Sequence, residues 1–105
     1  MTITLHDFDG EHSLTLDAGD LAADAAVVAA GHEPNGYFWE SFVQFAWPDL
    51  AERLDFDSEG GMFCALGSLS DLTQLKTAVE LVISSPSAVR ELVARAETAG
   101  VEFDD

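Results

Sequence analysis

The chain has 105 residues and a mass of 11.3 kDa, and 48% of its residues are hydrophobic. This length suits a single domain over residues 1–105, and the hydrophobic content is enough for a modest core and argues against a disordered chain. Twenty Asp and Glu against four Lys and Arg give a formal net charge of −16, which argues against nucleic acids and anionic membranes as partners because both are negatively charged.

Residues 3–16 have the pattern of a β-hairpin. Apolar residues alternate with polar ones on both sides of Asp9-Gly10, which is the period of a half-buried strand. The Asp-Gly pair tolerates the positive φ that both central positions of a tight hairpin turn require. This turn fixes the pairs that face each other, which are Ile3 with Leu16, Leu5 with Leu14, and Asp7 with His12.

Two helices are expected next. The first runs from Asp20, as its N-cap, to Ala30, and Gly31 stands just after its end, where glycine is favoured. A loop of residues 32–36 leads to a second helix over residues 37–46. Its buried side is predicted from apolar residues at helical spacing, namely Phe38, Phe42 and Phe45, flanked by Trp39, Val43 and Ala46.

A second hairpin is predicted in the second half of the chain. A short helical turn from Pro48 to Arg53 precedes it, because proline is favoured at the first position of a helix. The two strands are expected over residues 54–57 and 62–66. Residues 58–61, with two glycines, have the composition of the turn that joins them.

Two longer helices and a short strand complete the predicted elements. Ser70 is expected to cap a helix that ends near Ser84, and Ser85-Pro86 to begin the next one. Gly100 ends that helix, and residues 101–103 are expected to add an edge strand. The fold class is therefore α+β: a mostly antiparallel sheet of two hairpins plus a C-terminal edge strand, with about four helices packed on it.

The N-terminal segment and the cysteine usage bear on location. Residues 1–9 lack the basic and apolar regions of a signal peptide, and no apolar run reaches the ~18 residues of a membrane span. Cys64 is the single cysteine, which excludes an internal disulfide and suits a reducing compartment. We expect a cytoplasmic protein.

No residue pattern indicates catalysis. Cys64 lies in an apolar strand without a neighbouring cation to lower its pKa, and none of the three histidines stands in a nucleophile motif. The sequence also lacks a glycine-rich phosphate loop. We expect a protein without enzymatic activity, catalytic residues or a cofactor.

Two segments contain residue types that bind metals. Residues 55–60 match the first six positions of an EF-hand loop, but Leu66 occupies the twelfth position, where a bidentate Glu is required. The histidines and aspartates of residues 6–12 lie on a hairpin, whose successive side chains point to opposite faces. A hairpin turn and a cross-strand pair explain these segments better, so no metal ligand is predicted.

Aromatic residues beside acidic ones give the candidate contact surface. Tyr37, Trp39 and Trp47 are candidates for a part-exposed aromatic anchor at a protein interface, because so small a core cannot bury every aromatic ring. Acidic residues around an anchor favour a basic partner, whose encounter such a field speeds ~10- to 1000-fold at low salt. The same acidity also fits a purely solubilising surface or a halophilic source.

Two blocks of the sequence resemble a known family. Residues 31–40, GHEPNGYFWE, resemble the central motif of the Immunity protein 51 family of bacterial polymorphic toxin systems. Residues 54–65, LDFDSEGGMFCA, resemble its second block, and residues 101–105 fit its usual end. The similarity covers nearly the whole chain, so the resemblance implies a stand-alone immunity protein.

The resemblance implies an α+β cytoplasmic protein that binds and neutralises a cognate toxin domain encoded beside it. Many antibacterial toxin domains are basic nucleases, which an acidic inhibitor would fit by charge. The acidic and aromatic residues predicted to bind the partner are Glu33, Tyr37, Trp39, Glu40, Asp57 and Glu59. The alternative is a small acidic metal- or ligand-binding module or a regulatory interaction domain.

Overall fold

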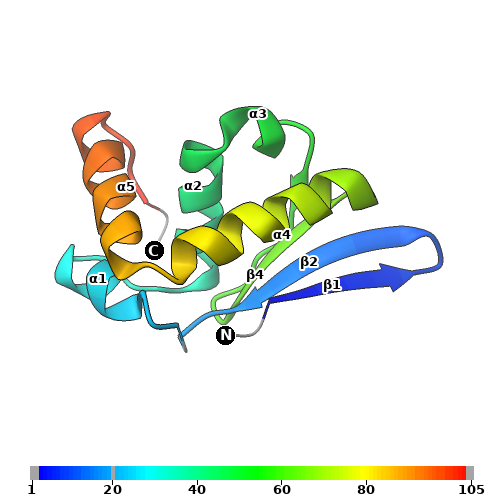
Figure 1. The fold of residues 1–105 in the computed structure, drawn as a ribbon, viewed down its shortest axis with the longest axis horizontal. Coiled ribbons are helices and arrows are strands. Elements are labelled where there is room, and N and C mark those ends of the chain that lie inside the picture. Colours follow the sequence, from blue (N-terminus) through cyan, green and yellow to red (C-terminus); the bar gives the residue numbers. More distant parts are fainter. Residues whose placement is uncertain (1–2, 20, 104–105) are drawn as a thin grey trace.

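A computed structural model of the protein describes residues 3–19 and 21–103. The elements of this part, in chain order, are β1 (Ile3–Phe8), β2 (Glu11–Asp17), α1 (Asp24–Ala29), α2 (Gly36–Ala46), α3 (Pro48–Ala51), β3 (Asp55–Phe56), β4 (Met62–Gly67), α4 (Leu69–Ile83) and α5 (Pro86–Thr98). The strands form one antiparallel sheet in the order β1-β2-β4-β3, so the predicted α+β class is confirmed. α1 and α5 lie at one end of the molecule and the tip of the β1–β2 hairpin at the other (Figure 1).

The first hairpin forms as predicted. Asp9 and Gly10 adopt φ values of 51° and 81°, the left-handed conformations of a tight hairpin turn. Because this turn fixes the register, β2 pairs with all six residues of β1, and the three predicted facing pairs are confirmed. At the turn end of the hairpin, Oδ1 of Asp7 lies 3.7 Å from Nδ1 of His12.

One face of the sheet is buried. Alternation along β2 and β4 sends Leu14, Leu16, Phe63 and Ala65 to the same side, where each is at most 1% exposed. α2 and α4 pack against this side. Burying one large side chain of this kind contributes about 1.5–3 kcal/mol. A shared core therefore holds these two helices to the sheet.

The second hairpin is also confirmed, with a first strand shorter than predicted. β3 consists of Asp55 and Phe56, which pair with β4. Beyond β3, the Asp57 N–H donates to the Cys64 carbonyl at 3.0 Å, and the hydroxyl of Ser58 accepts from the Cys64 N–H at 3.1 Å. A side chain thus replaces the backbone acceptor and interrupts the ladder, which resumes in the bridge between Glu59 and Met62.

α2 begins one residue before its predicted start and ends where predicted. Oδ1 of Asn35 accepts from the Phe38 N–H at 2.8 Å and caps the helix. The predicted stripe is buried at Phe38 and Phe42 and half-buried at Phe45, which lies nearer the surface. α2 therefore turns its aromatic side to the core, as its spacing indicates.

The two long C-terminal helices have serine caps, but one cap differs from the prediction. The hydroxyl of Ser68, rather than that of Ser70, accepts from the Asp71 N–H at 3.1 Å, so the predicted cap is wrong by two residues. The chain leaves the sheet at Gly67, and the helix starts at the first residue that can cap it. Ser85 caps α5 as predicted.

The first helix is shorter than its sequence pattern suggests. Its N-cap is Ala23, and the predicted cap Asp20 lies outside the described residues. The prediction of its end is confirmed: Gly31 has φ of 90° and donates its N–H to the Val28 carbonyl, and the His32 N–H donates to the Val27 carbonyl. These two bonds form a glycine C-cap, which supplies N–H donors to the last carbonyls of the helix.

The predicted C-terminal edge strand is wrong. Residues 101–103 form no strand; they turn back along α5, where the Val101 N–H donates to the Ala96 carbonyl at 2.9 Å. The Phe103 ring then lies 4.8 Å, between centroids, from both Phe38 and His32. Burial of one aromatic ring in the core thus directs the segment to the helices instead of to the sheet.

Candidate interaction surface

The start of α2 lies against the turn between β3 and β4. The Gly36 N–H donates to the Gly60 carbonyl at 3.0 Å, and a Cβ on Gly36 would collide with the carbonyl oxygens of Glu59 and Met62. Glycine permits such an approach because no side chain separates the two backbones. The first turn of α2, which carries Tyr37, is therefore held beside an acidic turn.

The structure leaves most of the predicted contact residues on the surface. The exposed ones from the two segments are Glu33, Tyr37, Asp57 and Glu59. Glu40 is half-buried on α2. Trp39 is 1% exposed, so the prediction that it belongs to a surface is wrong.

The three candidate anchors differ because of their positions along α2. The helix turns the Trp39 ring into the core, where its centroid lies 4.9 Å from Phe38 and 5.3 Å from Phe42. Trp47 is half-buried at the end of the helix, with its ring 6.3 Å from that of Phe42. Tyr37, at 42% exposed, is the most exposed of the three candidates.

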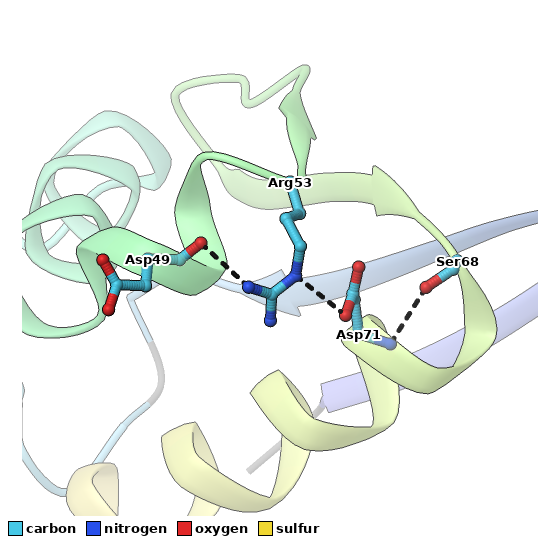
Figure 2. Close-up of polar contacts among 4 residues, drawn as sticks. All are labelled: Asp49, Arg53, Ser68 and Asp71. Carbon is cyan, nitrogen blue, oxygen red and sulfur yellow. Dashed lines mark hydrogen bonds and ion pairs between the residues drawn. The ribbon is translucent and has the colours of Figure 1, made fainter.

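Arg53 connects α3 to α4 (Figure 2). Its Nε donates to Oδ1 of Asp71 at 3.2 Å, and its Nη1 donates to the Asp49 carbonyl at 3.2 Å. Arg53 and Trp47 also line a hollow of about 520 Å³ between these helices. The guanidinium is thus bonded to residues of α3 and α4.

Charge is unevenly divided between the two parts of the fold. The helical layer, residues 21–54 and 68–103, contains all four Lys and Arg. The ion pairs that three of them form are Arg53–Asp71 at 3.2 Å, Lys76–Glu80 at 2.9 Å and Arg95–Glu91 at 3.1 Å. The sheet layer, residues 3–17 and 55–67, contains seven carboxylates and no Lys or Arg. The negative charge is therefore least compensated on the sheet.

Phe8 is an exposed aromatic residue that the sequence prediction missed. It is 75% exposed at the end of β1, next to the hairpin turn. The alternation along β1 indicates this exposure, because Ile3 and Leu5 face the core and Phe8 points to the opposite face of the sheet.

The sequence model of the Immunity protein 51 family matches residues 3–98. The chain belongs to this family. Among curated proteins none matches the chain, and among solved structures none does either. The family match spans both hairpins and all five helices of the part that the structure describes.

In this member of the Immunity protein 51 family, the single thiol is poorly suited to nucleophilic catalysis. Cys64 is 8% exposed, and burial raises the pKa of its thiol, as do the negative charges of Asp57 and Glu59. The thiolate is the nucleophilic form, so a raised pKa leaves Cys64 largely protonated near neutral pH.

The segments that resembled metal sites have other roles in the fold. Residues 55–60 comprise β3 and most of the turn to β4, so the segment belongs to a hairpin and not to a loop between two helices. Nε2 of His6 lies 2.9 Å from Oγ1 of Thr15 across the hairpin. Over residues 3–19 and 21–103, no three His, Cys, Asp or Glu side chains are arranged to hold a metal ion. Within the same ranges, no helix has the length and apolar character to cross a membrane.

Proposed function

We propose that the protein is an immunity protein that binds a cognate toxin domain in the cytoplasm and neutralises it by direct contact, without catalysing a reaction. The observation that carries this proposal is the match to the Immunity protein 51 family over residues 3–98. Burial of Cys64 and the raised pKa of its thiol make this cysteine a poor nucleophile, which supports an inhibitor that acts by binding rather than by chemistry.

The proposed contact surface begins at the acidic and aromatic residues around the start of α2. It includes the exposed or half-buried members of the predicted set, Glu33, Tyr37, Glu40, Asp57 and Glu59. The bond between Gly36 and Gly60 supports this grouping, because it holds the start of α2 beside the turn. An aromatic anchor among charges is the pattern of residues that contribute most to protein binding.

A basic toxin domain is the partner that the charge favours. The net charge of −16 attracts a cationic surface and speeds its encounter. A nuclease domain fits this description, because it binds phosphates through Lys and Arg. An acidic protein that occupies those cations would exclude the nucleic acid from the active site.

A growth assay tests the proposal. The C-terminal domain encoded by the neighbouring open reading frame is expressed in a sensitive host, with and without this protein. We expect the domain to stop growth and co-expression to restore it. An unrelated acidic protein of similar size serves as the control for non-specific charge effects. Toxicity that this protein does not relieve would contradict the proposed function for this pair.

A further inference from the structure

The sheet has a second face, opposite the one that packs on α2 and α4. We call it the outer face. Its middle is formed by the side chains of β2 and β4 that alternate with Leu14 and Phe63 and therefore point away from the core. The residues of this middle are Ser13, Thr15, Met62, Cys64 and Leu66. Cys64 is buried and the other four are half-buried, so the middle of the outer face is small, uncharged and accessible, with hydroxyl side chains on β2 and apolar ones on β4.

Carboxylates border this uncharged middle. Glu11 and Asp17 are the first and last residues of β2, and they point to the same face of the sheet as Ser13 and Thr15. Along the other side, Asp55 pairs with Leu66 in the ladder, Asp57 bonds to Cys64 through its backbone, and Glu59 pairs with Met62. All five carboxylates belong to exposed residues, and none takes part in an ion pair within the described residues.

β1 forms the remaining border and adds an aromatic residue. Thr4, His6 and Phe8 point to the outer face, since Ile3 and Leu5 face the core. Phe8 is 75% exposed, and it lies at the hairpin tip, which projects away from α1 and α5 (Figure 1). Because its backbone is already paired with Glu11, binding would order only the side chain of Phe8.

A middle without charged residues inside a charged border is the usual anatomy of a protein interface. We propose that the outer face is the docking surface for a Lys- and Arg-rich face of the toxin domain, with Phe8 as an apolar contact at its edge. This inference rests on the proposed function and extends the contact from Asp57 and Glu59, which the two surfaces share, across the outer face of the sheet. The border contains five carboxylates, and the sheet layer contains no Lys or Arg. This charge favours binding of a cationic protein surface.

The same charges argue against other occupants. A second copy of the chain, placed face to face, would bring two identical sets of carboxylates together, and like charges oppose association. Anionic lipids and nucleic acids would be repelled for the same reason.

Two variants of equal charge test the proposal. The sheet variant is Glu11→Gln/Asp17→Asn/Asp55→Asn, and the control variant is Asp49→Asn/Glu52→Gln/Glu102→Gln, on exposed residues of the helical layer. Each changes the net charge from −16 by +3, to −13. Binding to the toxin domain from the growth assay is measured by surface plasmon resonance at low and high salt. We expect the sheet variant to associate ~10-fold more slowly at low salt and the control to associate almost as fast as the parent.

A second pair of variants tests the middle of the outer face by obstruction. Ser13→Arg places a long cation at a half-buried position of β2, whereas Thr77→Arg places the same side chain at an exposed position of α4. We expect Ser13→Arg to weaken binding ~100-fold and Thr77→Arg to leave it within ~2-fold. Circular dichroism and the melting temperature of each variant show whether it is folded before binding is measured.

The outcomes separate this inference from the proposed function. If the parent binds and both the sheet variant and Ser13→Arg bind as their controls do, the outer face is not the docking surface, although the immunity role stands. A loss confined to a third variant, Glu33→Gln/Glu40→Gln, would place the toxin on α2 and the loop before it and likewise overturn the inference. If the parent does not bind the domain at all, both proposals fail together.

Discussion

At the scale of single residues, Gly36 decides how α2 meets the sheet. Its N–H bonds to the Gly60 carbonyl, and the space that a side chain would occupy is taken by the carbonyl oxygens of Glu59 and Met62. These are backbone atoms of a hydrogen-bonded hairpin, so they cannot move aside as the end of a flexible side chain can. Any other residue at position 36 must push the helix away from the turn.

We therefore predict that Gly36→Ala destabilises the fold by about 2–3 kcal/mol, as overpacking does. Alanine favours a helix over glycine by about 1 kcal/mol, but the clash with rigid backbone outweighs this gain. Urea unfolding followed by circular dichroism measures the free energy of unfolding. Gly60→Ala is the control, because its Cβ would meet nothing within 4 Å. Equal stability of the two variants would contradict the close approach of α2.

Single residues also show where prediction from the sequence stops. The spacing along α2 correctly places Phe38 and Phe42 in the core, because a helix has a fixed period. The same spacing puts Trp39 beside this stripe, but it does not tell how many aromatic rings so small a core can hold, so Trp39 is also a candidate anchor on the sequence alone. How far each ring is buried depends on how α2 packs against β4, which is a tertiary contact.

At the scale of elements, the start of α4 depends on Ser68. Its hydroxyl accepts from the Asp71 N–H at 3.1 Å, and Asp71 also accepts from Arg53. The cap and the link between α3 and α4 therefore share one residue (Figure 2). The sequence Ser-Leu-Ser offers two caps two residues apart, and the end of β4 at Gly67 selects the first.

Removal of this cap gives a prediction for the element. Ser68→Ala should lower the free energy of unfolding by about 1 kcal/mol, the usual cost of a lost serine cap. Ser70→Ala, two residues on and exposed, should change it by less than about 0.5 kcal/mol. Thermal and urea unfolding of both variants provide the comparison. A larger effect at Ser70 than at Ser68 would show that the helix starts at the later residue.

Local signals predicted the hairpins better than they predicted the C-terminal segment. Asp9-Gly10 fixes the turn and the register of β1 and β2 by itself, so that hairpin follows from the sequence. Residues 101–103 have strand-like composition, but their course is set by the site into which Phe103 packs, between Phe38 and His32. That site is built from α2 and the loop before it, distant in sequence, and no local pattern reveals it.

At the scale of the whole molecule, the sequence predicts the amount of charge but not its arrangement. The net charge of −16 is read directly from the composition. The high density of negative charge on the sheet cannot be read from the composition. It arises because strand pairing brings the acidic residues of both hairpins into one layer. This arrangement opposes folding, because folding brings like charges together, while the three Lys and Arg ion pairs of the helical layer favour it.

The balance of these two effects predicts how stability responds to salt. Exposed ion pairs contribute at most about 1 kcal/mol each, and salt weakens them. Salt also weakens the repulsion among the sixteen uncompensated negative charges. Repulsion involves many more pairs, so we expect its relief to dominate. Raising NaCl from about 0.01 M to about 1 M, which shortens the Debye length from about 30 Å to about 3 Å, should raise the melting temperature by about 4–8 °C, equivalent to about 1 kcal/mol. Calorimetry checks the shift, and the sheet variant, with its charge reduced to −13, should gain less. A melting temperature that falls with salt would mean that the ion pairs outweigh the repulsion.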